Sequence, residues 1–128
     1  MFQFSQKSYR KLTGVHPDLV ACVVACLYRY TPVDFAVIEG VRDVETQKLL
    51  VKNGKSWTMN SRHLVQEDGW GYAVDLAPWV RGAIPWDEWR YFEEISNAMY
   101  MAARYLRINI TWGGDWKVKD GPHFQLER

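Results

Sequence analysis

Apolar residues with helical spacing predict three helices. The first is expected over residues 17–30, where a proline stands in the first turn of PDLVACVVACLYRY and Thr31-Pro32 follows the end. A short helix is expected over residues 44–53, with Gly54 as its stop. The clearest helix spans residues 85–107, where apolar side chains at steps of three and four should face the core. This stripe consists of Trp86, Trp89, Phe92, Ile95, Met99, Ala102 and Leu106.

Alternating apolar residues predict four strands between these helices. They are expected over residues 33–40, 72–77, 108–112 and 123–126, with Gly113-Gly114 as the turn after the third. Segregated helices and strands favour an α+β fold, with helices packed on a small antiparallel sheet, over a doubly wound parallel sheet. The length of 128 residues predicts a single domain over residues 1–128.

The composition indicates what kind of chain this is, but it says little about what the protein binds. A hydrophobic fraction of 48% predicts a globular chain, and seven Trp with seven Tyr suggest an aromatic groove. The net charge of +1 provides no basic field, so we expect no nucleic-acid partner. No secretory signal and no run of eighteen apolar residues stand out, which predicts cytoplasmic synthesis without membrane insertion. Cys22 and Cys26 are expected to be small core residues, and the chain is expected to be a monomer.

Three side chains offer zinc ligands from distant parts of the sequence. His63 follows a polar loop, Asp75 lies on a predicted strand, and His123 stands near the end of the chain. A catalytic zinc site typically uses three such ligands and leaves one position open. Asp120, three residues before His123, could bring a further carboxylate beside the ion. Isolated histidines are more often structural or surface residues, so the spacing alone leaves both interpretations open.

Five segments, taken together, resemble the motifs of one peptidase family. They are DFAVIEGVRDVETQ, SRH, GYAVDLAP, WGGDW and DGPHFQL. In this order they resemble the VanY-like zinc D-alanyl-D-alanine carboxypeptidases and L-alanyl-D-glutamate endopeptidases that act on peptidoglycan. The resemblance extends from about Asp34 to Leu126, and it implies a LAS-type peptidase fold with the zinc site at the sheet edge.

The resemblance assigns roles to particular residues. Asp120 would be the general base, and the arginine that follows the family's first strand falls on Arg42. Arg42 would bind a substrate carboxylate or help to hold the developing oxyanion. The implied Zn²⁺ ligands are one residue from each of three motifs: His63, Asp75 and His123.

Several of these residues also have simpler interpretations. Arg42 could be a surface arginine paired with Asp43 or Glu45. Gln47 could face the cleft and bind substrate, or it could be a solvated helical residue. Ser61, from the same motif as His63, could donate to substrate or cap the turn that leads into the histidine.

The WGGDW segment and His16 have open roles as well. Trp112 and Trp116 could form a wall of the groove, with at least one of them expected to be buried. Asp115 could accept the second ring proton of a ligand histidine, or cap a turn. His16, beside a proline at a helix start, is expected to be structural.

The spacing between the first two ligands departs from the family. Most members known to us have six residues between the histidine and the aspartate, whereas eleven lie between His63 and Asp75. This difference predicts a five-residue insertion, VQEDG or its neighbours, before Gly71. Because loop length costs little free energy, we expect a longer turn at the rim of the cleft with the ligands still together.

The resemblance implies a zinc peptidase acting on the stem peptides of bacterial peptidoglycan. An L-alanyl-D-glutamate endopeptidase of the phage endolysin type is expected, because the chain is short, lacks an export signal and carries GAIPWDEWRYFEEISNAM, which resembles the helix start of such endolysins. A separate membrane-permeabilising protein would then let it reach the wall. The alternatives are a D-Ala-D-Ala carboxypeptidase, or a non-catalytic wall-binding module with structural zinc, which would have no need of Asp120.

Overall fold

The computed structural model describes residues 2–56 and 58–127. None of the helices in these ranges is long and apolar enough to cross a membrane. The elements follow one another as α1 Gln6–Lys11, α2 Pro17–Ala25, a π-helical turn Cys26–Tyr30, β1 Phe35–Glu39, α3 Val44–Lys52, β2 Ala73–Pro78, α4 Trp89–Leu106, β3 Ile110–Trp112, a 3-10 turn Gly113–Asp115 and β4 His123–Leu126.

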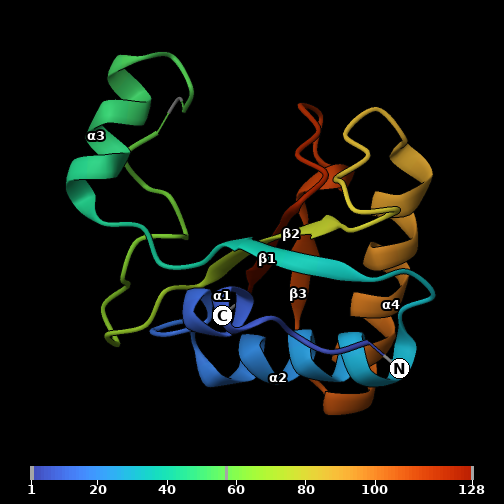
Figure 1. The fold of residues 1–128 in the computed structure, drawn as a ribbon. Coiled ribbons are helices and arrows are strands. Elements are labelled where there is room, and N and C mark those ends of the chain that lie inside the picture. The colour runs from blue at the N-terminus through green and yellow to red at the C-terminus, as the bar shows by residue number, and fades with distance from the viewer. Residues whose placement is uncertain (1, 57, 128) are drawn as a thin grey trace.

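The four strands form one antiparallel sheet in the order β1-β2-β4-β3 (Figure 1). Successive side chains of a strand point to opposite faces of the sheet. Val74 and Leu76 of β2 therefore enter the core, while Asp75 between them faces the other way. In β4 the same alternation buries Phe124 and leaves His123 on the face of Asp75. The predicted α+β fold is confirmed, and the chemistry-bearing residues share the face away from the core.

Helices α2 and α4 pack against each other and against the core face of the sheet. Leu19 and Val23 of α2 are fully buried, as are Ile95 and Met99 of α4. Both cysteines are buried and unpaired, which confirms their interpretation as small core residues. The predicted helix over residues 17–30 is also confirmed, although its last turn is π-helical.

The apolar pattern does not predict α1, which lies along β1 at the edge of the sheet. Ser5 caps this helix, since its hydroxyl accepts a hydrogen bond from the Ser8 N–H. The buried Ser8 hydroxyl in turn accepts from the Val37 N–H at 3.0 Å, and Lys11 donates to the Ile38 carbonyl at 2.7 Å. Helix α1 therefore satisfies backbone groups that an edge strand would otherwise leave open.

The predicted helix over residues 85–107 begins four residues late. The Glu88 N–H donates to the Pro85 carbonyl in a turn, and α4 starts at Trp89. Trp86 is 59% exposed and Trp89 38% exposed, so their place in the core stripe was wrong. The strands expected over residues 33–40 and 108–112 each start two residues later than predicted.

Candidate metal centre and substrate cleft

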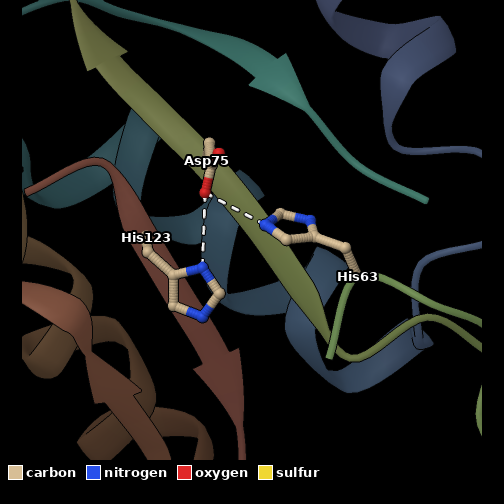
Figure 2. Close-up of side chains that lie close together, drawn as sticks. All are labelled: His63, Asp75 and His123. Carbon is tan, nitrogen blue, oxygen red and sulfur yellow. Dashed lines mark hydrogen bonds and ion pairs between the residues drawn. The ribbon is translucent and has the colours of Figure 1, made fainter. Parts of the chain in front are cut away.

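Three side chains from separate parts of the chain meet on the open face of the sheet (Figure 2). The antiparallel register places Asp75 directly opposite His123 on the two central strands, and His63 reaches them from the loop before β2. The Asp75 Oδ1 atom lies 3.2 Å from His63 Nε2 and 3.4 Å from His123 Nδ1. The three candidate ligand atoms all lie within 4.8 Å of one another. The site therefore lies on the two central strands, where β4 begins, and not on an edge strand of the sheet.

The outer nitrogen of each ring is held by a second partner. His63 Nδ1 donates to the Gly40 carbonyl at 2.8 Å, and His123 Nε2 donates to Gln125 Oε1 at 2.9 Å. These bonds turn the other ring nitrogens toward Asp75, which is how outer partners orient metal-binding histidines. Asp115 is not such a partner, because its carboxylate accepts from the Tyr100 hydroxyl, so of its two open roles the bond from a ligand histidine was the wrong one.

The electrostatics of this trio suit a bound cation. Burial raises the pKa of the Asp75 carboxyl, but hydrogen bonds to His123 and His63 outweigh burial and leave this pKa well below its usual value. Burial lowers the pKa of His123, whereas its bonds to Asp75 and Gln125 raise it, with a net increase. Two imidazole nitrogens and one carboxylate oxygen form a donor set that zinc accepts. The residues present therefore fit a zinc ion.

Asp120 stands beside the trio and outside it. Its main chain is fixed, because the Asp120 N–H donates to the Gly113 carbonyl at 2.9 Å and its carbonyl accepts from the His123 N–H at 3.2 Å. Asp120 is an exposed residue that lines the cleft. The neighbouring protein displaces part of the water around its carboxyl and so raises the pKa of that group, and the charge of Asp75 raises it further. A carboxylate held in this way beside a metal site can accept a proton.

Gly113 allows the Asp120 segment to approach the site closely. A methyl group at Gly113 would lie 2.5 Å from the Asp120 carbonyl oxygen and 3.0 Å from the Cβ atom of His123. We therefore expect Gly113→Ala to displace both residues and to lower kcat/KM by roughly 10²-fold, the loss that a shift of about 1 Å can cause. Kinetics on a stem peptide would measure this loss, with the exposed Lys117→Ala in the same segment as control. Unchanged kinetics in Gly113→Ala would contradict the expected displacement.

Arg42 lines the cleft and is held by two neighbours. Its Nε donates to Glu39 Oε1 at 2.6 Å, and its Nη1 donates to Gln47 Oε1 at 2.7 Å. A pairing with Asp43 or Glu45 was therefore the wrong alternative. Glu39 reaches this face because β1 bulges: Val37 stands opposite Leu76 of the core, but Glu39 stands opposite Asp75. Bulges beside active sites commonly redirect a side chain in this way.

Gln47 and Ser61 take positions that sequence reasoning left open. Gln47 is fully buried, so the solvated alternative was wrong. It also does not line the cleft, and it contacts Arg42 where a substrate contact had been considered. The Ser61 hydroxyl accepts from the His63 N–H at 3.1 Å, which confirms the turn-capping role, and Ser61 also lines the cleft.

The two tryptophans of WGGDW have different positions. Trp112 is buried and donates its indole N–H to the Gly121 carbonyl at 2.6 Å. Trp116 lines the cleft, with its ring 4.9 Å from the ring of His123. The expectation that at least one of them is buried is confirmed. The cleft has a volume of about 780 Å³, and its lining includes Ser56, Thr58 and Asn60 from one segment and Trp116, Val118 and Asp120 from another.

The five-residue insertion over residues 65–69 lies away from the cleft. None of its residues lines that space, so its expected position at the rim was wrong. Gly71, just after the insertion, is hydrogen-bonded to the segment before α2. The His16 N–H donates to the Gly71 carbonyl, and the Gly71 N–H donates to the Gly14 carbonyl. His16 caps α2 by accepting from the Asp18 N–H, which confirms its structural role. The insertion is thus accommodated against the body of the protein.

Comparison with known proteins agrees with this geometry. The family model for phage L-alanyl-D-glutamate peptidase matches residues 1–128. The chain belongs to this family. An L-alanyl-D-glutamate peptidase of Escherichia phage T5 is 28% identical over 130 residues, which cover 99% of this chain and 90% of the relative. The crystal structure of ChiX, an L-Ala D-Glu endopeptidase of Serratia marcescens, matches with a TM-score of 0.88 and 44% identity, over 98% of this chain and 90% of ChiX. The predicted family and fold are both confirmed.

Proposed function

We propose that the chain is a zinc-dependent L-alanyl-D-glutamate endopeptidase that hydrolyses the stem peptides of bacterial peptidoglycan. The observation that carries the proposal is the convergence of His63, Asp75 and His123 in a cleft that Asp120 and Arg42 also line. Membership of the family and the likeness to ChiX over nearly the whole chain support the bond to be cleaved.

The residues of the site would have separate roles in amide hydrolysis. His63, Asp75 and His123 would hold the zinc ion, which supplies Lewis-acid polarisation of the scissile carbonyl and of the attacking water. Asp120 accepts a proton from the water and returns one to the leaving nitrogen, so the C–N bond breaks with release of a neutral amine. Arg42, fixed by Glu39 and Gln47, donates to a substrate carboxylate or to the carbonyl oxygen as negative charge develops.

The proposal also includes the organisation and setting of the protein. Residues 1–128 would act as one catalytic domain and as a monomer. The chain would act on the bacterial cell wall after a separate protein has opened the membrane. Its partner is then the peptide stem of peptidoglycan, with no nucleic acid involved.

Digestion of purified peptidoglycan tests the proposal directly. We expect new D-glutamyl amino termini by mass spectrometry, their loss after treatment with a chelator, and their return when zinc is added. Zinc-dependent release of free D-alanine would instead support a D-Ala-D-Ala carboxypeptidase. No zinc-dependent product would favour a wall-binding module with a structural ion.

A further inference from the structure

Helix α3 stands away from the sheet and from the other helices (Figure 1). It is nevertheless tied to the site, because the segment after it supplies one wall of the cleft through Ser56 and Thr58. The chain leaves the sheet at Glu39, passes through α3 and this wall, and reaches His63 in the loop before β2. A wall with so little support from the core needs specific contacts to keep its position relative to the metal ligands.

Gln47 provides such contacts. Among the α3 residues it alone is buried, with no exposed surface. Its amide oxygen accepts from Arg42 Nη1 at 2.7 Å, while its amide nitrogen donates to the Thr58 carbonyl at 2.6 Å and to the Ser56 hydroxyl at 3.0 Å. The amide oxygen thus accepts from the side of the metal site, and the amide nitrogen donates to the wall. A buried amide with these partners holds both sides in one arrangement, because each lost bond would leave a polar group unpaired.

Arg42 continues this connection to the sheet. Its Nε donates to Glu39 at 2.6 Å, and the bulge in β1 places Glu39 opposite Asp75. The Arg42 N–H also donates to the His63 carbonyl at 2.9 Å. A continuous series of hydrogen bonds therefore runs from the wall through Gln47 and Arg42 to the strand pair that carries a metal ligand.

We propose that Gln47 is a positioning residue, which acts on the reaction through Arg42 by fixing its guanidinium, and which fixes the wall at Ser56 and Thr58. The inference rests on the proposed function for its kinetic consequences. A guanidinium held at two of its donors keeps one orientation and presents the others to the substrate. Without Gln47, Arg42 retains Glu39 as its side-chain partner among the described residues. The wall would keep the backbone bond from the Ser56 N–H to the Leu50 carbonyl of α3, but Thr58 and the Ser56 hydroxyl would lose their contacts with that helix.

A double-mutant cycle between Gln47 and Arg42 tests this route of action. Gln47→Met keeps the length of the side chain and removes all three hydrogen bonds. We expect it to lower kcat by about 10–100-fold, as loss of an orienting partner does. In an Arg42→Ala background kcat should fall by less than about twofold, because the partner is already gone, while KM still rises through the lost wall contacts. Gln47→Glu keeps an acceptor for Arg42 and should recover part of kcat, with a raised KM because the wall contacts are lost.

Lys48→Met is the matched control on the exposed side of the same helix, where Lys48 pairs with Glu45 in a solvated contact of 3.6 Å. It should leave kinetics unchanged. Equal losses of kcat for Gln47→Met in both Arg42 backgrounds would mean that Gln47 does not act through Arg42, and would overturn the proposal. So would kinetics equal to those of the starting protein.

A spectroscopic measurement separates this proposal from the proposed function. The ¹H–¹⁵N NMR signal of the Arg42 Nε–H should be sharp in the starting protein, and broadened or shifted in Gln47→Met. An unaffected signal overturns the positioning role whether or not the protein is active. Failure of the proposed function shows up differently, as a starting protein that yields no D-glutamyl termini. The NMR comparison then still decides whether Gln47 orients Arg42.

Discussion

Asp120→Asn is expected to lower kcat by about 10²–10⁴-fold, the range that general acid–base catalysis contributes. The amide keeps the size of the side chain but cannot accept a proton from water. The backbone bonds that fix residue 120 to Gly113 and His123 do not involve the side chain and should persist. Metal content should also persist, because the cluster of His63, Asp75 and His123 forms without Asp120. Steady-state kinetics and elemental analysis of the same preparation would measure both quantities.

Asp115→Asn is the matched control for this substitution. Asp115 lies in the same segment and has the same carboxylate, but it bonds to the Tyr100 hydroxyl and does not line the cleft. Its replacement should leave kcat within about twofold, since exposed hydrogen bonds contribute little. Turnover that survives Asp120→Asn would remove Asp120 from the role of base. Metal lost from Asp120→Asn would mean that this carboxylate supports the ion instead.

The residues at the centre of the site could be predicted because the pattern of the strands fixes their faces. HFQL alternates between polar and apolar residues, and Asp75 is the one polar residue between the apolar neighbours of AVDLA, so both Asp75 and His123 are expected on the face away from the core. The antiparallel register then makes them direct neighbours. The spacing alone left their chemistry open, and the resemblance of the motifs to the family decided it.

The network around Arg42 could not be predicted, because it depends on a bulge that the sequence does not mark. A regular β1 would direct Glu39 toward the core, and only the irregularity after Val37 brings it to the cleft. The partners of the ligand histidines were missed for a related reason. Gly40 contributes a main-chain carbonyl, which carries no signal in the residue type, and Gln125 was assigned no role.

The remaining errors come from short or exposed segments. Helix α1 is six residues long and held by single polar contacts from Ser8 and Lys11 to β1. It therefore has no periodic pattern of apolar residues from which a helix could be predicted. The insertion was expected at the cleft because it joins two ligands, yet a loop with close ends can pack on either side of them. Here Gly71 pairs with Gly14 and His16, which directs the loop toward α2.

Asp75→Asn is expected to abolish metal binding and turnover together. Asp75 is the carboxylate that both histidines contact, and it is largely enclosed by them. The isosteric amide removes its negative charge without creating a cavity. We expect zinc affinity to fall by more than the roughly 10–100-fold that loss of an outer partner causes. Zinc at about 100 times its dissociation constant should stabilise the starting protein by about 2.7 kcal/mol and stabilise Asp75→Asn much less. Thermal unfolding with and without zinc measures this difference.

Asp34→Asn is the control for a general effect of lost charge, since Asp34 precedes β1, away from the cleft lining, and its side chain accepts from the neighbouring Phe35 N–H. It should keep the full stabilisation by zinc. Unchanged zinc affinity in Asp75→Asn would remove Asp75 from the ligand set. The two variants distinguish the roles of the two carboxylates. Asp120→Asn should lose turnover and keep the ion, while Asp75→Asn should lose both. A purely structural zinc would give a different pair of results, because Asp120→Asn would then change neither the ion nor the binding of peptidoglycan.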